Sequence, residues 1–381
     1  MASAKDKVTE ILSHADIELN GSRPWDLQVH NENFYARAIA QGSLGIGESY
    51  MEGWWDCEDL PEFFNRVLRA SLGKHIDFNI PNALLYIQSI LFNQQDQRKT
   101  LRVGTMHYDL PNEVWEATLD TAMTGSTGYY PRGDETLDEA QEAKKKLLFD
   151  KLAPEHGQNL LDIGVGWGSF VSYAALHYDM RSVGVTVSSA QRDYIYKRYG
   201  KEMIDVRVHD YRETVLASPV DRAISVEMFE HVGQKNYRTF FELVRKSLRD
   251  NGRFVLQTSV NHRPIPSIDP WMNKYIYPGG SLPTVGQIGT AVHGLFHVED
   301  VQDIGVHYDK TLRQWIEKFR KNRTIIKALG KERLGMDPEV FCRMWNYHYL
   351  SVAGGFRSRK ISVHQYLLSP NGIPGGYVSI R

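Results

Sequence analysis

The sequence predicts an α/β protein in which helices cover both faces of a parallel sheet, with a small α+β or largely helical N-terminal domain in front. Three observations lead to this prediction. From residue 105 onward, short apolar runs alternate with amphipathic helical patterns. A glycine-rich turn joins the first apolar run to the next helix, and further turn signals separate the later runs. Repeated strand–helix–strand units form parallel crossovers, so we expect one doubly wound sheet.

The individual elements follow from the same periodicities. Amphipathic helices are expected at 137–152, where the pattern is strongly charged, and at 236–248. Asp250-Asn251-Gly252 is expected to form a turn ahead of the last strand. Strands are expected at 159–163, 182–187, 204–208, 221–226 and 253–258. In the N-terminal part, the patterns predict helices at 5–15, 31–40 and 60–72 and a strand at 27–30.

These patterns divide the chain into three parts. Residues 1–75 are expected to form the small N-terminal domain, residues 76–104 a helical linker, and residues 105–381 the domain that carries the sheet. Ligands of a doubly wound sheet bind beyond the carboxyl ends of its strands. The functional residues are therefore expected just after the strands of the third part.

The composition argues against several classes of function. The 381 residues include 45 Lys and Arg against 46 Asp and Glu, for a net charge of −1. A dedicated nucleic-acid-binding protein relies on excess positive charge, so we expect no nucleic-acid partner. The two cysteines build no disulfide framework and no signal-peptide pattern opens the chain, which indicates the cytoplasm. No apolar run reaches the roughly 20 residues of a transmembrane helix, so membrane contact is expected to be peripheral.

The strongest local signal is the turn after the first strand. Asp162 is followed by Gly164, Gly166 and Gly168, and a helix opens at Ser169. The glycines leave bare backbone against which a ligand can lie. Their spacing differs from the G-x-G-x-x-G of dinucleotide-binding turns, and the Lys-Ser/Thr of a P-loop does not follow. The turn therefore predicts a nucleoside ligand without a pyrophosphate, namely S-adenosylmethionine (SAM), and an ordinary tight loop is the alternative.

Two later strand ends add candidates for SAM binding. The second strand ends at Thr186 and is followed by Gln191, where an acid would normally bind the ribose hydroxyls. We expect Gln191 or the Thr186 hydroxyl to replace that acid. After the third strand, Asp210 could accept from the adenine amino group, and a helix N-cap explains this residue equally well.

Titratable residues gather after the fourth strand. Glu227, Glu230 and His231 lie close together there. Two carboxylates beside an imidazole at a strand end indicate a site with perturbed pKa values. A metal site is the alternative, but no H-x-x-H, H-E-x-x-H or cysteine pair accompanies the cluster, and we expect no metal.

Motifs over nearly the whole chain resemble the cyclopropane-fatty-acyl-phospholipid synthase family. They lie at 41–56, 107–113, 161–168, 184–191, 228–233, 269–280, 306–312 and 353–357. The resemblance implies a Rossmann-like SAM-methyltransferase sheet and the addition of a methylene from SAM across the double bond of an unsaturated acyl chain. It also implies homodimers on a phospholipid membrane, hence a cytoplasmic enzyme peripheral to the inner face of the membrane. By the same resemblance, Tyr108, Ser126 and Tyr211 are expected to contact SAM.

Two residues depart from the family pattern around the catalytic base. The resemblance implies that a cysteine, a histidine, an acid and a tyrosine hold a bicarbonate ion that acts as general base. Glu230 and Tyr308 match the acid and the tyrosine, whereas Thr127 stands for the cysteine and Gln257 for the histidine. Threonine and glutamine can hydrogen-bond an anion but carry no charge. We therefore expect weak binding of bicarbonate, or its replacement by water or by Glu230, the one strong acceptor left of the cluster, with His231 as a further catalytic candidate.

The chemistry requires a dry pocket in which a carbocation is stabilised. Aromatic faces are expected to do this, and the candidates are Tyr129, Trp271, Tyr275 and Tyr308. A base then removes a proton from the new methyl group, and the ring closes. A weak or misplaced base would give a methylated or methylene product instead. The expected function is cyclopropane formation on a phospholipid acyl chain, and the alternatives are C-methylation of another hydrophobic alkene without ring closure and an inactive lipid-binding homologue.

Overall fold

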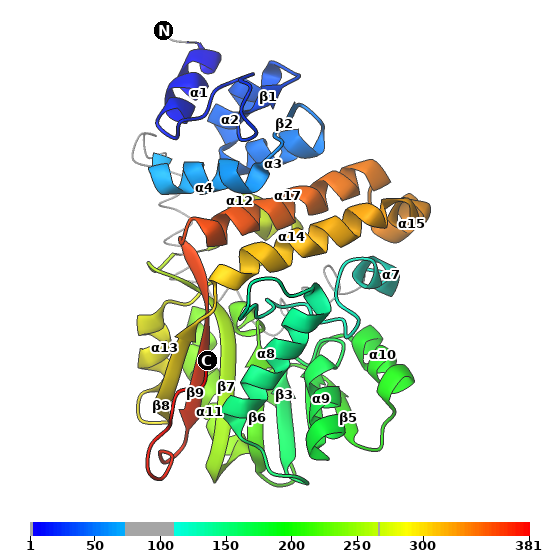
Figure 1. Cartoon of the computed structure of the whole chain (residues 1–381), viewed down its shortest axis with the longest axis vertical. Coiled ribbons are helices and arrows are strands. Elements are labelled where there is room, and N and C mark those ends of the chain that lie inside the picture. The colour runs from blue at the N-terminus through cyan, green and yellow to red at the C-terminus, as the bar shows by residue number, and fades with distance from the viewer. Residues whose placement is uncertain (1–2, 73–109, 266) are drawn as a thin grey trace.

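A seven-stranded sheet forms the larger part of the molecule (Figure 1). The structure is a computed structural model and describes residues 3–72, 110–265 and 267–381. The strand order is β5-β4-β3-β6-β7-β9-β8. The strands are β3 (Asn159–Ile163), β4 (Arg181–Thr186), β5 (Ile204–Val208), β6 (Val220–Val226), β7 (Leu248–Asn261), β8 (His297–Asp303) and β9 (Ile361–Ser369). Those from β3 to β7 are parallel, and β9 pairs antiparallel with both β7 and β8.

The order of the strands places the ligand site. From β3 the chain proceeds to β4 and β5 on one side, then returns to β6 and β7 on the other. The carboxyl ends of β3 and β6 therefore lie next to each other at the point where the strand order reverses, which is where open α/β sheets bind ligands.

Helices cover both faces of this sheet, so the doubly wound prediction is confirmed. They are α8 (Leu137–Leu152), α9 (Ser169–Tyr178), α10 (Ser189–Tyr199), α11 (Tyr237–Ser247) and α13 (Val285–Val292). Side chains of β3 alternate between the two layers. Leu160 joins a core with Phe149 of α8, while Leu161 joins a core with Phe240 and Phe241 of α11.

Several bounds differ from the sequence prediction. The expected strand 253–258 is part of the longer β7. Asp250-Asn251-Gly252 lies inside that strand, so the turn expected there is wrong. Leu248 pairs with Val220 and Arg253 with Arg222, which makes the intervening residues a bulge. Sequence patterns did not predict β8 and β9.

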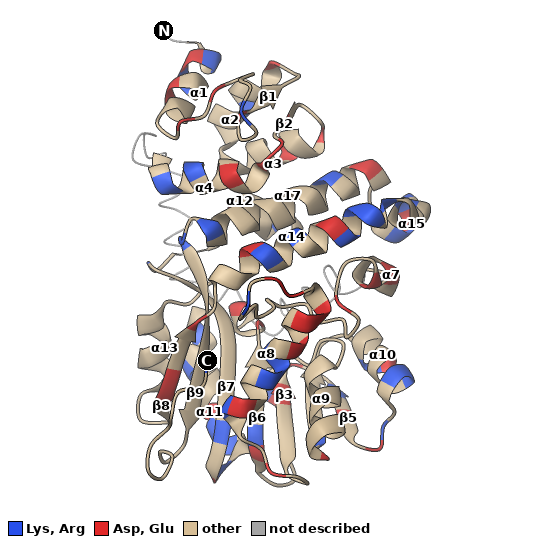
Figure 2. Ribbon diagram, in the orientation of Figure 1, with Lys and Arg blue, Asp and Glu red and all other residues tan. Residues whose placement is uncertain are grey.

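The helix α8 is less solvated than its charge suggests. Its capping box, Thr136 with Glu139, begins the helix at the expected place. Lys144 and Lys151, however, are fully buried. Lys151 donates to the side chain of Gln302 at 2.7 Å. Both signs of charge are interspersed along the ribbons of α8 and of α14 (Val306–Lys321) (Figure 2).

A pair of long helices lies beyond the carboxyl edge of the sheet. Figure 1 shows α14 (Val306–Lys321) and α17 (Pro338–Arg357) side by side, between the sheet and the N-terminal elements. The shorter helices in this region are α7 (Asn112–Glu116), α12 (Pro270–Tyr275), α15 (Arg323–Ala328) and α16 (Gly330–Leu334).

The N-terminal elements pack on this helical layer. They are α1 (Ala4–Ser13), β1 (Gln28–Val29), α2 (Asn33–Gln41), α3 (Ser43–Met51), β2 (Trp55–Asp56) and α4 (Leu60–Ala70). One apolar core contains buried residues of these elements together with residues of α14 and α17. Trp271 of α12 is fully buried against α3 at Gly47, where an added Cβ would collide with the indole ring. Its Nε1 lies 3.3 Å from the sulfur of Met51.

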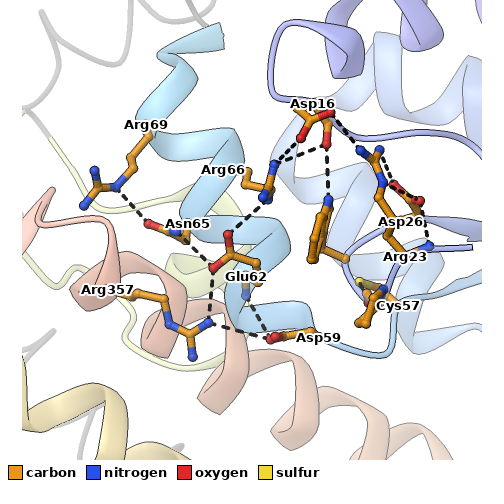
Figure 3. A network of polar contacts seen from close by, with 12 residues as sticks. Asp16, Arg23, Asp26, Cys57, Asp59, Glu62, Asn65, Arg66, Arg69 and Arg357 are labelled. Atoms are coloured by element: carbon orange, nitrogen blue, oxygen red, sulfur yellow. Dashed lines mark hydrogen bonds and ion pairs between the residues drawn. The ribbon is translucent and has the colours of Figure 1, made fainter. Parts of the chain in front are cut away.

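Polar contacts supplement this packing (Figure 3). Arg357 of α17 donates to Glu62 of α4 at 3.3 Å, and Arg66 pairs with Glu62 at 3.0 Å and with Asp16 at 2.6 Å. All four side chains retain contact with solvent. Such ion pairs contribute at most about 1 kcal/mol each, so the apolar core dominates the attachment.

Two further observations concern the membrane and the linker. Within the residues that the structure describes, no helix has both the length and the apolar character to cross a bilayer. The linker expected at 76–104 and the SAM candidate Tyr108 lie outside the described residues.

Candidate active site

The turn between β3 and α9 presents bare backbone at the reversal point of the sheet. Gly164 and Gly166 have φ values of 94° and 54°, and Gly168 is also in the left-handed region. At Gly164 an added Cβ would lie 2.6 Å from Met228. At Gly166 it would meet no described residue within 4 Å. Among the described residues the chain is therefore packed against one side of the turn, and the Gly166 side leaves room for a ligand.

Asp162 lies one residue before the end of β3 and has unusual electrostatics. It is 1% exposed, and neither carboxylate oxygen has a hydrogen-bond partner among the described residues. Burial raises its pKa to about 8. A buried carboxylate is costly unless it is paired with positive charge. SAM carries a positive sulfonium and an ammonium group, so the residues at this turn fit that cofactor.

The end of β4 forms a local hydrogen-bonded group. The hydroxyl of Thr186 donates to Oε1 of Gln191 at 2.6 Å, and the hydroxyl of Ser188 caps α10 by accepting from the Gln191 amide. The two candidates for the ribose therefore contact each other, and the side-chain nitrogen Nε2 of Gln191 keeps its N–H donors available.

At the end of β5, Asp210 has a structural role as a helix N-cap. Its carboxylate caps the short helix η2 (Tyr211–Glu213) and forms an ion pair with Arg212 at 2.6 Å. The neighbouring Tyr211 is buried, and its hydroxyl has no hydrogen-bond partner in the described part of the chain.

Ser126 is held by two side chains of α8. Its hydroxyl accepts from the ammonium of Lys144, and its carbonyl accepts from Gln141 at 2.7 Å. Burial lowers the pKa of Lys144 to about 7, against the opposing effect of Glu227 and Asp120. Lys144 is thus a buried cation that sequence reasoning missed. The signal was present, since Lys144 lies four residues from both Ala140 and Leu148 on the apolar stripe of the helix.

Three expected site residues converge on Glu227, directly after β6. Its Oε1 accepts from the Thr127 amide at 3.0 Å and from Nε2 of Gln257 at 2.8 Å. Its Oε2 accepts from the Tyr308 hydroxyl at 2.7 Å. Gln365 donates to Oε1 of Gln257 at 2.9 Å, which directs the other end of that amide towards Glu227.

This arrangement corrects the sequence prediction that Glu230 is the one strong acceptor of the cluster. Glu230 lies in the short helix η3 (Phe229–His231), and its Oε1 accepts from the Ser259 amide at 2.6 Å. Its Oε2 is buried without a partner among the described residues. Burial, followed by the charge of Glu227, raises the pKa of Glu230 to about 7. Burial lowers the pKa of His231 to about 4, so its imidazole is neutral at pH 7.

A cavity of about 1560 Å³ connects these groups with the N-terminal elements. Glu227, Glu230 and Tyr308 line it. Apolar and aromatic side chains from both ends of the chain form most of the remaining wall, among them Val8, Ile11, Phe34, Phe63, Trp345 and Phe356. Of the four aromatic candidates for stabilising the carbocation, Tyr308 lines the cavity, whereas Tyr129, Trp271 and Tyr275 are not among its lining residues.

No group of three or more His, Cys, Asp or Glu within the described ranges is arranged to hold a metal ion.

Comparison with known proteins identifies the family. Residues 95–366 match the family described as mycolic acid cyclopropane synthetase. The cyclopropane-fatty-acyl-phospholipid synthase of Escherichia coli (strain K12) is 40% identical over 367 residues, which cover 96% of this chain and 93% of that relative. The tuberculostearic acid methyltransferase UfaA1 of Mycobacterium tuberculosis is 31% identical over 91% of this chain and 84% of the relative.

Solved structures agree with this assignment. The mycolic acid cyclopropane synthase CmaA1, crystallised with SAH and CTAB, is 30% identical and aligns with a TM-score of 0.63 over 70% of this chain and 97% of its own. SAH is the product that SAM leaves after methyl transfer, and the Asp162–Gly166 turn fits that cofactor. The chain therefore belongs to the cyclopropane synthetase family of SAM-dependent methyltransferases.

Proposed function

We propose that this enzyme transfers a methylene group from SAM to the double bond of an unsaturated fatty acyl chain of a phospholipid and closes a cyclopropane ring. The cavity is the observation that carries the proposal. Ligand pockets for small molecules measure roughly 300–1,000 Å³, and this cavity, at about 1560 Å³, is larger and mainly apolar. A long apolar chain matches it better than a compact polar metabolite does.

We assign the SAM side of the site mainly to the carboxyl ends of β3, β4 and β5. We assign SAM to Asp162, the three glycines of the turn, Thr186, Gln191, Ser126, Tyr108, Asp210 and Tyr211. Gly166 supplies the open backbone, and the positive charge of SAM favours the ionised form of Asp162, which then supplies a negative charge for the cation. Gln191 can offer its amide donors to the ribose.

The lipid side is assigned to the cluster around β6 and β7. Here the catalytic set is Glu230, His231, Tyr308, Thr127 and Gln257. The alkene is a weak nucleophile, so its position against the sulfonium methyl must be fixed in the absence of water. The carboxylate of Glu230 can stabilise the carbocation that forms, because it faces the same cavity.

The N-terminal part is proposed to complete the lipid cavity. We propose the division 1–75, 76–104 and 105–381, with the first part giving peripheral contact with a phospholipid membrane and a homodimer. The role of this part in the lipid cavity is supported by Val8 and Phe63, which line the cavity wall. Cosedimentation with anionic vesicles and light scattering test the membrane contact and the dimer.

The alternative is C-methylation of the alkene without ring closure. The changed residues at the base site favour it, because they act after methyl transfer, when the fate of the carbocation is decided. The name of the relative UfaA1, a tuberculostearic acid methyltransferase, is consistent with such an outcome for this family.

Turnover with methyl-¹³C SAM and vesicles of an unsaturated phosphatidylethanolamine tests the proposal. The expected result is a gain of ¹³C in the acyl chains, with ring carbons visible by NMR. A ¹³C-methyl or methylene signal without ring carbons would select the alternative. The proposed function would be contradicted if the protein did not bind SAM. It would also be contradicted if the protein bound SAM tightly but labelled no unsaturated phospholipid.

A further inference from the structure

The carboxylate of Glu227 accepts hydrogen bonds from three donors that would otherwise be available to an anion at this site. Its two oxygens accept from the Thr127 amide, from Nε2 of Gln257 and from the hydroxyl of Tyr308, at 2.7 to 3.0 Å. Thr127, Gln257 and Tyr308 are also the positions that the family resemblance assigns to a bicarbonate ion. A carboxylate and bicarbonate present the same pair of anionic oxygens to such donors.

The residues present therefore do not fit bicarbonate. The donors are already satisfied by a side chain of the chain itself. A second anion in this place would also share the cavity with the carboxyl groups of Glu227 and Glu230. Like charges enclosed together are strongly unfavourable.

We propose that Glu227 is a built-in replacement for bicarbonate and is the general base that removes the proton from the transferred methyl group. This inference rests on the proposed function, since it concerns the second half of that reaction. Tyr308, Gln257 and Thr127 are then positioning residues, which fix the two oxygens of the base.

The backbone supports a functional reason for a glutamate here. Glu227 has a φ of 52°, in the left-handed region that a residue with a side chain seldom adopts. Its amide donates to the carbonyl of Gln257 at 2.7 Å, so the neighbouring strand holds it in this conformation. Such strain persists where the surroundings determine it and is frequent at active sites. Glycine would avoid the strain but would provide no carboxylate.

The electrostatic environment suits a base. Burial raises the pKa of the Glu227 carboxyl above its ordinary value, while the charge of Lys144 and the three hydrogen bonds oppose this shift. Burial and the charge of Glu227 hold the pKa of Tyr308 well above its ordinary value, so its hydroxyl remains a donor at neutral pH. A carboxylate with a raised pKa accepts a proton more readily near neutral pH.

The step balances in atoms and charge. The alkene carbon bonds to the methyl group of SAM, SAH leaves, and the acyl chain carries a carbocation. Glu227 takes one proton from the new methyl group, and the electron pair of that C–H bond closes the third side of the ring. The protonated Glu227 then releases its proton to water after the product leaves.

Two replacements of Glu227, by glycine and by glutamine, should respond differently when an anion is added to restore turnover. Glu227→Gly relieves the strain and leaves a space between the same donors, whereas Glu227→Gln fills that space with an amide that cannot accept the proton. Both variants should lose 10²–10⁴-fold in turnover in CO₂-free buffer. Added bicarbonate or formate should restore at least tenfold in Glu227→Gly and nothing in Glu227→Gln. The wild type should change less than twofold on removal of CO₂.

A matched control separates catalysis from strain. Ala153→Gly also replaces a residue of positive φ (42°), at the end of α8, and should leave turnover and its insensitivity to bicarbonate unchanged. Binding of ¹³C-bicarbonate, measured by NMR line broadening, should be detected with Glu227→Gly and not with the wild type.

Three results would overturn the inference. They are bicarbonate dependence of the wild type, bicarbonate binding by the wild type, and more than a tenth of wild-type turnover in Glu227→Gly without an added anion. If the wild type binds SAM but alkylates no lipid, the proposed function fails instead. The NMR comparison then still decides whether Glu227 takes the place of the anion.

Discussion

Replacement of Asp162 by asparagine should make the SAM-free protein increasingly more stable than the wild type as the pH rises. The same replacement should weaken SAM binding. Asp162 is almost completely buried, and its oxygens have no hydrogen-bond partner among the described residues. Burial raises its pKa from 3.8 to about 8. Below pH 8 the folded protein therefore keeps a proton on this carboxyl that the unfolded chain loses above pH 4. Asparagine has nearly the same shape and does not titrate.

The magnitude follows from the linkage of protonation to folding. Because the folded pKa lies above the unfolded pKa, the contribution of Asp162 is most favourable below pH 4 and is lost as the pH rises through about 8. Each pH unit in this window costs about 1.36 kcal/mol. The advantage of Asp162→Asn over the wild type should thus grow by about 3 kcal/mol between pH 5 and pH 7. The constant cost of burying an amide cancels in this difference.

Urea unfolding of the two full-length proteins at pH 5, 6 and 7, without SAM, measures this difference. Other titrating groups are common to both proteins and cancel as well. A stability difference that does not change with pH would refute the reasoning. Calorimetry should also show a ten- to hundredfold loss of SAM affinity, about 1.4–2.8 kcal/mol, because the cofactor loses its negatively charged neighbour. Unchanged SAM affinity would place Asp162 outside the cofactor contacts.

Two further substitutions test the same site. Gly166→Leu should abolish SAM binding, because the side chain would enter the space beside the turn where no described residue lies. The left-handed backbone adds a cost of about 1–2 kcal/mol for a residue with a side chain. Calorimetry measures the SAM affinity, with circular dichroism as the folding control, and a normal affinity would contradict the assigned ligand position. Lys144→Met should move the acid limb of the pH–kcat profile to higher pH, because the Lys144 charge lowers the pKa of Glu227. Turnover measured from pH 5.5 to 8.5 tests this. An unchanged acid limb would show that Glu227 is not the titrating base.

The sheet that carries the site was predictable because its signals are local. The apolar run of β3 and the glycines after it appear as a contiguous pattern, and β3, β5 and α8 have the expected bounds. The long strand β7 absorbs Asp250-Asn251-Gly252 as a bulge, because pairing with β6 continues on both sides of it. Turn propensity was outweighed there by the hydrogen bonds of the sheet.

The chemistry of the site was less predictable because it depends on contacts between distant segments. The sequence places Glu227 in a titratable cluster, but the three groups that donate hydrogen bonds to it come from positions 127, 257 and 308. Only the fold shows that these donors converge on Glu227 rather than on Glu230. The burial of Lys144 likewise depends on Ser126, which lies outside the helix.

The wall of the cavity has a consequence for the order of folding. Val8 and Phe63 from the start of the chain line the same cavity as Tyr347 and Phe356 near its end, and Arg343 pairs with Asp56 across 287 positions. Closing so long a loop costs entropy before any contact compensates for it, so such contacts form late. The strands around the SAM turn are close in sequence and should assemble first.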